Sequence, residues 1–550
     1  MGMVLRDRLG LFLLLIVFIA CKVPHLWYPY YWDESGMFAP GVMAMYLHGA
    51  SLLPNAIDVS FGRGHPLLYH AVCAQWMKLF GPSHFSLHCF SLLISIALIV
   101  MVYEAGLRLF TRRVAFISVL ALSINTFFFV QSSFLTPDIF IALLSFSTLY
   151  FYVREKYFLS ALLLTMLVYT KESGIVAVFI LGIDALTGAL RSDTPVKDRL
   201  AKVASVLVPL IVGLSFYVTQ KIMMGWYTYP GAFSSHPNFD PGSSIYWLKT
   251  ILGVLLVDEH RYFLSLLLIF LSLAAAIAQG NVKFASLALP GIFLYALTHG
   301  HIAHTEFLNI LFLTLFLGST ALSIFFLGRM RYYTTGQQKK FINLLSIFTL
   351  FYVYYFSVYN FQWRYIFAAM VALYFVFAVF ADFYISRLFP AVYYLVLAGI
   401  GCAGIYCFTH EAGDSDLGFF DGMKLQQEVV NYFEQNELYN NSISVSSDFE
   451  EVHLRDPYTG FLHTDRNFSN VRSGAYNSQA DYVVFSSIEY DSTDYARFKK
   501  DTTFQLILSL QEGIKWAEIY KKKQGTFENE GATPYEIPDT AAKSPSAQRR

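Results

Sequence analysis

The chain has 550 residues, of which 55% are hydrophobic and only 14% are charged. Soluble domains carry about 25% charged residues, so this chain lacks the charge that a water-facing surface needs. Lys plus Arg and Asp plus Glu number 39 each, so the net charge indicates neither a nucleic-acid nor an acidic partner, and no nucleic-acid partner is expected. The composition therefore excludes an ordinary soluble domain and predicts a polytopic α-helical membrane protein.

Apolar runs of membrane-spanning length recur along the chain up to residue 408. A helix needs about 20 apolar residues to cross the bilayer core, and on this criterion we expect about 13 transmembrane helices. The expected spans are residues 9–26, 84–106, 113–130, 139–153, 157–170, 174–190, 203–222, 261–279, 284–299, 306–327, 341–359, 364–386 and 391–408. Lys and Arg are about twice as frequent in the loops that a cytoplasmic N-terminus would place inside, the usual bias of such loops. This orientation leaves the C-terminal region outside the cytoplasm.

The character of the chain changes after residue 409, where Asn, Ser, Asp and Tyr become more frequent. We expect residues 1–409 to form a transmembrane domain, with a long first outer loop at 27–83. Residues 410–523 should form a small α/β domain outside the cytoplasm. It would contain a helix at "MKLQQEVVNYFEQN" and strands at "NSISVSS", "ADYVVFSS" and "GIKWAEIYKKK". Residues 524–550 are polar, contain Gly and Pro, and are expected to be disordered.

Two adjacent acids, Asp33 and Glu34, follow the first apolar segment in "YYWDESG". The expected topology places them on the outer side, at the start of the long first loop. Loops of that length in compact proteins are usually functional or disordered, and this one is too apolar to be disordered. A carboxylate at the mouth of a membrane cavity can act as a general base, orient a hydroxyl or hold a metal. The alternative is a pair of acids in a solvated loop.

Further charged residues are expected on the same side, and each has a structural alternative. Asp138, which follows "SSFLTP", can be a helix N-terminal acid favoured by the dipole. Lys171 in "YTKESG" can pair with its neighbour Glu172. Arg364 in "WRYIFAAM" can extend to the membrane interface, as Arg near a helix end often does. Arg63, between two glycines, can be a mobile surface charge.

The order of these segments resembles the dolichyl-phosphate-mannose protein mannosyltransferase-like family, glycosyltransferases of the C superfold, and also the lipid A aminoarabinose transferases. The resemblance covers roughly the first 175 residues. It rests on the acidic pair followed by "HPLLY", "KLFGPSHFSLH", "LRLFTRRVAF", "SSFLTPD" and "YTKESG", with the Arg-Tyr of "WRYIFAAM" much later. Each segment is weak alone, whereas the ordered set is specific for the family and not for a substrate.

The resemblance implies an integral membrane glycosyltransferase that moves a hexosyl or pentosyl group from a polyprenyl-phosphate carrier to a protein, lipid A or surface glycan. It implies a bacterial inner membrane, with the site facing the periplasm. Asp33 would be the base, and Glu34 and Asp138 would complete an acidic catalytic set. The donor phosphate would be bound by Arg63, His65, Lys171, Arg364 and Tyr365.

The chain departs from the family at the turn Gly64-His65-Pro66-Leu67, where many relatives have Lys-Pro-Pro or His-Pro-Pro. The basic contact would then pass to Arg63 or His65. No cofactor is expected with certainty, and a divalent cation stays an open alternative. Two segments carry metal-type ligands, "THGHIAHTE" with His299, His301, His304 and Glu306, and "VDEHR" with Asp258, Glu259 and His260. Loop histidines that bind nothing are commoner.

Two other functions compete with the enzyme. A transporter or flippase for lipid-linked sugars would call for an internal repeat and polar residues in the middle of spans. The sequence has no evident repeat, and its acids gather in the expected outer loops. A noncatalytic subunit of the same fold is the second competitor, and the presence of Asp33 argues against it.

Overall fold

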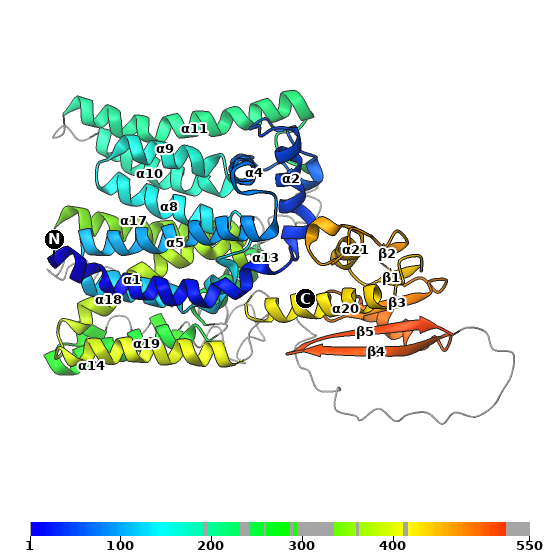
Figure 1. The fold of residues 1–550 in the computed structure, drawn as a ribbon. Helices are drawn as coiled ribbons and strands as arrows, with labels where there is room; N and C mark the ends of the chain where they lie inside the picture. Colours follow the sequence, from blue (N-terminus) through cyan, green and yellow to red (C-terminus); the bar gives the residue numbers. More distant parts are fainter. Residues whose placement is uncertain are drawn as a thin grey trace.

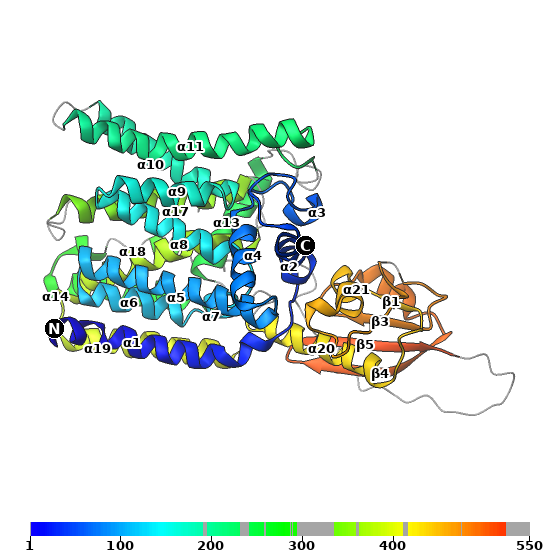
Figure 2. The same ribbon diagram turned by 45° about the horizontal axis from the view of Figure 1, so that its top comes forward.

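The computed structural model describes residues 2–190, 195–230, 241–257, 260–285, 288, 290–293, 335–358, 362–410, 416–474 and 476–523. In this part of the chain, long helices lie side by side in a bundle, and a smaller sheet-containing domain sits at one end (Figure 1, Figure 2). We call residues 416–523 the C-terminal domain, and the bundle end beside it the domain end. The predicted architecture of a helical membrane protein with a small C-terminal α/β domain is confirmed.

The helices of the bundle follow the apolar runs of the sequence. In chain order they are α1 (Gly2–Lys22), α5 (His84–Leu109), α6 (Arg112–Ser123), α7 (Thr126–Gln131), α8 (Asp138–Val153), α9 (Tyr157–Val168), α10 (Ile175–Ala189), α11 (Val196–Met224), α13 (Pro241–Leu256), α14 (Tyr262–Gln279), α17 (Gly336–Val358), α18 (Phe367–Ile385) and α19 (Ala391–Thr409). Short turns continue or join them, namely η1 (Val23–Trp27), η3 (Glu172–Gly174), η4 (Val282–Ala285) and η5 (Trp363–Ile366). The segment between α1 and α5 folds into η2 (Glu34–Phe38), α2 (Ala39–His48), α3 (Val59–Gly62) and α4 (Leu68–Phe80).

Among the described residues, eight helical segments are long and apolar enough to cross a membrane. They are Arg8–Trp27, His84–Leu109, Glu172–Ala189, Val196–Met224, Tyr262–Gln279, Gly336–Val358, Trp363–Ile385 and Ala391–Thr409. The helices α8 and α9 are apolar but shorter. The expected span 306–327 and part of 284–299 lie outside the described residues, so the total of about 13 spans stays a prediction. The chain is a multi-pass membrane protein.

The expectation of one continuous helix at 113–130 is wrong, because α6 and α7 are separate. The side chain of Asn125 accepts a hydrogen bond from the backbone N–H of Phe128 (2.8 Å) and so caps α7. Asn is a favoured residue at this position. At the other end of α7, the ammonium of Lys22 donates to the carbonyl of Phe129 (2.8 Å). Both ends of this short helix are therefore held by side chains, and the chain turns back at the domain end before α8.

The helices α5 and α6 pack closely against each other at Gly106. A Cβ on Gly106 would lie 2.6 Å from the Cα of Ala115 on α6, which is shorter than real Cβ contacts. Small residues allow helix backbones in membranes to pack directly against one another. Gly106 therefore sets the spacing of α5 and α6.

The C-terminal domain is a mixed five-stranded sheet with helices packed on it. The strands are β1 (Ile443–Val445), β2 (Val471–Ser473), β3 (Tyr482–Ser486), β4 (Phe504–Glu512) and β5 (Lys515–Lys522), in the order β2-β1-β3-β5-β4. β1 pairs in parallel with β2 and β3, and β5 pairs antiparallel with β3 and β4. The helical elements are α20 (Gly418–Gln435), α21 (Asp448–Arg455), η6 (Pro457–Thr459) and α22 (Ser492–Phe498). The predicted helix and the three predicted strands are confirmed as α20, β1, β3 and β5, whereas β2 and β4 were not expected.

We expect Gly106→Ala to destabilise the bundle, because the added methyl group would force α5 and α6 apart. Overpacking of a close contact costs about 1–3 kcal/mol. Gly399 in α19 is the matched control, since a Cβ there would meet nothing within 4 Å. In thermal unfolding in detergent, Gly106→Ala should lower the midpoint and Gly399→Ala should not. Equal midpoints for the two variants would contradict the close approach.

Candidate active site

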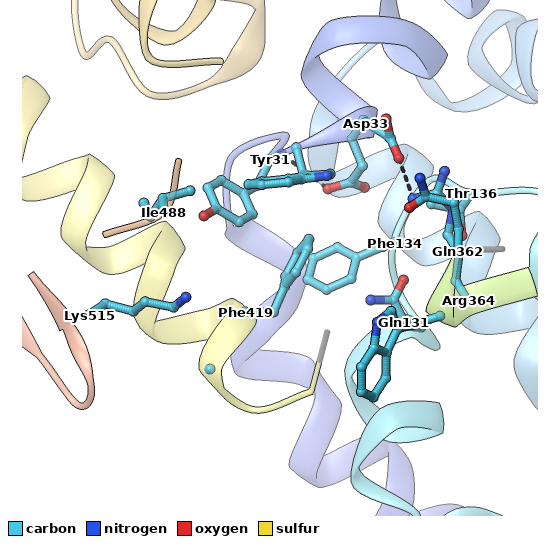
Figure 3. Close-up of a pocket in the computed structure, with 14 residues that line it drawn as sticks. Tyr31, Asp33, Gln131, Phe134, Thr136, Gln362, Arg364, Phe419, Ile488 and Lys515 are labelled. Atoms are coloured by element: carbon cyan, nitrogen blue, oxygen red, sulfur yellow. Dashed lines mark hydrogen bonds and ion pairs between the residues drawn. The ribbon is translucent and has the colours of Figure 1, made fainter. Parts of the chain in front are cut away.

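Asp33 lies in a tight turn between η1 and α2. Trp32, directly before it, has a φ of +55°, in the left-handed region that bulky residues rarely adopt. The next residues form the π-helical turn η2, which starts at Glu34. We call residues 30–36 the Asp33 segment. The turn presents Asp33 to Arg364 of η5 at the domain end (Figure 3).

Arg364 in η5 stands between two carboxylates from distant parts of the chain. Its guanidinium Nη1 forms an ion pair with Asp33, and its Nε lies 3.0 Å from Oδ2 of Asp138. The Arg364 side chain is only 13% exposed and that of Asp138 only 3%. Arg364 therefore does not extend to the membrane interface, the alternative raised by its sequence position.

Lys171 completes the charged cluster from the break between α9 and α10. Its ammonium lies 3.7 Å from Oδ1 of Asp138 and 3.3 Å from the centre of the Tyr365 ring. The Lys171 side chain is 7% exposed. Two carboxylates thus face two cations, and a cation–π contact holds the lysine. The alternative pairing of Lys171 with Glu172 is not formed, since Glu172 binds His65 instead.

These residues meet because each begins or ends a helix at the domain end. Asp138 is the first residue of α8 and follows Pro137. Lys171 follows the end of α9, and Arg364 precedes α18. Helix ends carry unsatisfied backbone groups and lie where the apolar spans stop, so charged residues are tolerated there. Hydropathy alone therefore brings the three residues to one level of the bundle.

A cavity of about 250 Å³ opens beside this cluster (Figure 3). Its described lining residues are Tyr31, Trp32, Asp33, Glu34, Gln131, Phe134, Thr136, Gln362, Trp363, Arg364, Gly418, Phe419, Ile488 and Lys515. The last four belong to the C-terminal domain, so the bundle and the domain form the cavity together. Asp138 and Lys171 stand behind Arg364 and are not lining residues.

Glu34 differs from Asp33 although the two are neighbours. Its carboxylate accepts hydrogen bonds from the backbone N–H groups of Leu135 (2.5 Å) and Tyr31 (3.2 Å) and contacts Nε2 of His88 (3.0 Å). The residue is 1% exposed. Its oxygens are thus engaged by protein groups, and Glu34 fastens the Asp33 segment to α5 and to the loop before α8.

Arg63 and His65 line a second cavity and not the first. Nδ1 of His65 lies 2.7 Å from Oε2 of Glu172, and Arg63 is exposed at a φ of +44°. The walls are mainly apolar and come from α9, α10 and α11, including Val168, Ile175, Val178, Pro209, Leu210 and Leu214. The five expected phosphate-binding residues therefore fall into two groups. Arg63 and His65 belong to the second cavity, and Lys171, Arg364 and Tyr365 belong to the charged cluster. The groups are connected because Lys171 is the sequence neighbour of Glu172, which binds His65.

Several cavity residues carry no signal that sequence reasoning uses. Gln131, Thr136 and Gln362 are ordinary polar residues near helix ends, and only their nearness to Asp138 and Arg364 in sequence could have indicated them. Lys515 and Ile488 come from the C-terminal domain, and no local pattern connects them with residue 33.

Of the candidate metal ligands, only His260 lies among the described residues. His299, His301, His304, Glu306, Asp258 and Glu259 lie outside the described residues. In the remainder, no group of three or more His, Cys, Asp or Glu side chains is placed to hold a metal ion. Asp33 and Asp138 are instead joined through Arg364, so no step of the chemistry below uses a metal.

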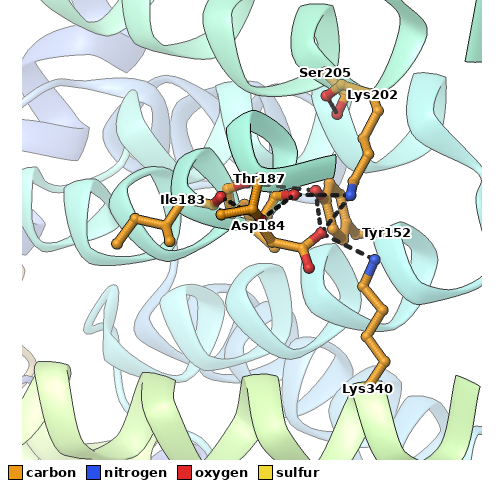
Figure 4. Close-up of polar contacts among 8 residues, drawn as sticks. Tyr152, Ile183, Asp184, Thr187, Lys202, Ser205 and Lys340 are labelled. Carbon is orange, nitrogen blue, oxygen red and sulfur yellow. Dashed lines mark hydrogen bonds and ion pairs between the residues drawn. The ribbon is translucent and has the colours of Figure 1, made fainter. Parts of the chain in front are cut away.

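A second ionic cluster lies at the opposite end of the bundle (Figure 4). The carboxylate of Asp184 on α10 pairs with Lys202 of α11 (2.7 Å) and Lys340 of α17 (2.9 Å), and it accepts a hydrogen bond from Tyr152 of α8 (2.8 Å). The cluster ties four helices together and adjoins none of the cavity residues. We interpret it as structural.

The C-terminal domain touches the Asp33 segment through His453 of α21. Nε2 of His453 lies 3.2 Å from the hydroxyl of Ser35, which itself donates to the carbonyl of Trp32 (2.8 Å). Because that hydroxyl proton is used, Nε2 of the imidazole is the donor and Nδ1 is left as a lone pair. The His453 ring also stacks on Tyr31 and Phe461. Burial lowers the pKa of His453 to about 3.

These features define a multi-pass membrane protein with an acid–base cluster in a cavity beneath a C-terminal domain. Residues 64–217 match the sequence model of the dolichyl-phosphate-mannose-protein mannosyltransferase family, so the resemblance is confirmed over that part of the chain. The matched region contains Asp138 and Lys171 but neither Asp33 nor Arg364. No curated protein matches the chain.

Two solved structures are similar to the chain, and both are of ArnT from Cupriavidus metallidurans. The apo structure is 14% identical and has a TM-score of 0.48. The structure bound to undecaprenyl phosphate is 14% identical and has a TM-score of 0.45. Each match covers 92% of this chain and 97% of the ArnT chain.

We expect the contact between the C-terminal domain and the bundle to weaken in acid. In the unfolded chain His453 binds a proton near pH 6.5, whereas in the folded protein it stays neutral down to about pH 3. This contribution to stability is complete above pH 6.5 and is lost as the pH falls towards 3. Between pH 7 and pH 5 the loss is about 2 kcal/mol.

Unfolding of the detergent-solubilised protein at both pH values tests this, with His453→Gln as the matched variant. Gln keeps an amide donor near the position of Nε2 but does not titrate in this range. The variant should show a smaller pH dependence than the wild type. Identical pH dependence in the two proteins would exclude His453 as the source.

Proposed function

We propose that the protein is an integral membrane glycosyltransferase that moves a hexosyl or pentosyl group from a polyprenyl-phosphate carrier to an acceptor hydroxyl. The observation that carries the proposal is the placement of Arg364 between Asp33 and Asp138 at the wall of a cavity. The family match over residues 64–217 supports the same class of reaction.

Asp33 is the proposed base. Its carboxylate forms an ion pair with the guanidinium of Arg364, so an acceptor hydroxyl would have to compete with Arg364 for it. A donor phosphate at Arg364 would compete for the guanidinium and release Asp33. The released carboxylate would then take the proton of the acceptor hydroxyl. In this order, the Asp33 carboxylate becomes available to the acceptor only when the donor is bound.

Arg364 and Lys171 are the proposed stabilisers of the leaving group. As the acceptor oxygen bonds to the anomeric carbon, the bond from that carbon to the phosphate oxygen breaks, and the polyprenyl phosphate departs with the electron pair. The two cations carry this charge in a partly dry site, where charge-assisted hydrogen bonds are strong. Asp138 holds both cations in place. Attack from the face opposite the phosphate inverts the anomeric configuration.

The second cavity suits the lipid part of the donor. Its apolar walls belong to the membrane helices α9, α10 and α11, and its polar end carries Arg63 and His65. An isoprenoid chain would find apolar surface there, as ligands in such clefts usually do. Its phosphate would then lie towards Lys171, which adjoins Glu172 of this cavity.

The proposed location is the inner membrane of a bacterium, with the cavity and the C-terminal domain facing the periplasm. Basic residues gather at the opposite end of the bundle, where the chain turns between spans, including Arg108, Arg113, Arg154, Lys156, Lys202 and Lys340. Such loops stay in the cytoplasm. The acceptor would be a protein, lipid A or a surface glycan that reaches the cavity from the periplasmic side.

Transfer of label tests the proposal, with Asp33→Asn as the decisive variant. Asn is isosteric but cannot accept the proton, so kcat should fall by about 10²–10⁴-fold. The KM for the donor should stay the same or fall, because Arg364 no longer pairs with a carboxylate at residue 33. Purified protein is incubated with labelled polyprenyl-phosphate sugars and a membrane extract, and label is followed into protein, lipid and glycan.

Asp198→Asn is the matched control, since this exposed carboxylate lies at the start of α11, at the opposite end of the bundle. It should transfer label at the wild-type rate. Full activity of Asp33→Asn would remove Asp33 from the role of base. If wild-type protein labels no fraction but carries a lipid-linked sugar across a vesicle bilayer, the protein is a transporter.

A conservative change at Arg364 tests whether the contact of its guanidinium with both Asp33 and Asp138 is needed, or only its positive charge. Lys keeps the charge but presents a single ammonium, which cannot match the planar contact of Arg with two oxyanions. We expect Arg364→Lys to raise the KM for the donor and lower kcat, each by about tenfold or more, as the loss of one charge-assisted contact implies. Steady-state kinetics check this, and Arg108→Lys at the opposite end serves as the control. Wild-type constants for Arg364→Lys would contradict the role of the bridge.

A further inference from the structure

The Asp33 segment is held in a conformation that it would not adopt alone. Trp32 has a φ of +55°, and the turn η2 that follows is π-helical, a geometry frequent at functional sites. Such backbone costs free energy and persists only where surrounding contacts over-determine it. Glu34 supplies one anchor, towards the bundle. Further contacts come from the C-terminal domain.

The C-terminal domain supplies those contacts through α21 and η6. The Phe449 ring stacks on Trp32 with 4.7 Å between ring centroids and 19° between planes. The Tyr458 hydroxyl donates to the carbonyl of Ser35 (2.9 Å). A Cβ on Gly36 would lie only 3.1 Å from the Phe449 ring, so the domain is packed directly on the backbone of the turn.

Phe449 and Tyr458 make these contacts without reaching the cavity. The described lining residues of the C-terminal domain are Gly418, Phe419, Ile488 and Lys515. Phe449 and Tyr458 therefore touch Trp32 and Ser35, the residues on either side of the acidic pair, and not the space where substrate would bind. Their effect on the reaction can only pass through the Asp33 segment.

We propose that Phe449 and Tyr458 are positioning residues that aim the Asp33 carboxylate, which makes the C-terminal domain part of the catalytic apparatus and not only its cover. The inference rests on the proposed function, because it requires Asp33 to be the base.

A change in the backbone conformation of Trp32 would move Asp33, because Asp33 is the next residue in the chain. Without the Phe449 ring, Trp32 loses its stacking partner, one of the contacts that hold its positive φ. Asp33 would then move away from the acceptor side of Arg364. Misplacement of a catalytic group by about 1 Å can cost 10²-fold in rate. Arg364 and Lys171 are attached to other helices, so binding of the donor phosphate would not change. The prediction is a loss in kcat with little change in the KM for the donor.

The experiment compares Phe449→Ala, Phe449→Tyr and Tyr458→Phe in the full-length protein. Tyr495→Ala is the matched control, because that half-buried ring contacts Phe485 and Trp516 within the domain. For each variant we would measure kcat, the KM for the donor and the thermal midpoint.

We expect Phe449→Ala to lower kcat about 10- to 100-fold while the KM for the donor stays within about twofold of wild type. Phe449→Tyr keeps the stacking ring and should retain kcat. Tyr458→Phe loses only one hydroxyl, so it should fold normally and lower kcat by a smaller factor. Tyr495→Ala should lower the midpoint without a specific loss of kcat.

A double-mutant cycle shows whether the effect passes through Trp32. If it does, adding Phe449→Ala to Trp32→Ala should lower kcat no further. Additive losses, or wild-type kcat in both Phe449→Ala and Tyr458→Phe, would overturn the inference. If Phe449→Ala does not fold, Tyr458→Phe decides the question alone. If the wild type transfers the sugar and Asp33→Asn does not, the proposed function stands whatever the results for Phe449 and Tyr458. If the wild type transfers no sugar, both proposals are wrong.

Discussion

The structure depends on one guanidinium that joins two acids. Asp33 and Asp138 lie more than a hundred residues apart and would repel each other at the domain end of the bundle without a cation between them. Arg364 supplies that cation from a third segment, and Lys171 shares the charge of Asp138. Removal of one member would leave an unpaired charge in a largely buried place, which is costly. The cluster thus ties the start of α8, the end of α9 and the turn η5 before α18 to the Asp33 segment, and Asp33 and Arg364 of this cluster line the cavity.

A second cluster of paired charges lies elsewhere in the bundle. In the described part of the chain, two ionic clusters lie towards opposite ends of the bundle. At the domain end, the ion pair of Asp33 and Arg364 lies at the wall of a cavity. At the other end, the carboxylate of Asp184 contacts Lys202, Lys340 and Tyr152. The Asp184 cluster therefore joins four helices, whereas the cluster of Asp33 and Arg364 lies beside a cavity, where the proposed donor phosphate would meet its cations. This asymmetry is what a transferase needs if the membrane body is to stay rigid while substrates exchange.

Sequence reasoning reaches as far as local patterns carry information. Hydropathy predicts most helices, and because spans end at two levels, it also predicts that Asp33, Asp138, Lys171 and Arg364 share one end of the bundle. Which of these residues pair depends on the direction that each side chain faces around its helix axis. Hydropathy gives only the level of a residue along a span. The expected span 113–130 is wrong because hydropathy does not reveal a helix boundary that one side chain sets. Asn125 lies between α6 and α7 and caps α7. Phe449 and Lys515 had no signal at all, because their partners lie hundreds of residues away.

That distance has a consequence for how the protein is made. The hydrogen bond between Ser35 and His453 spans 418 residues of chain, and the one between Tyr458 and Ser35 spans 423. The Asp33 segment precedes the described helices α2 to α19 in the chain and receives its contacts from α21 and η6 only after those helices have been made. Contacts so remote in sequence form late, because a very long loop must close first. A ribosome-bound chain would therefore carry an assembled membrane body and an unfinished site, and the site would be completed only once the last strand had left the ribosome.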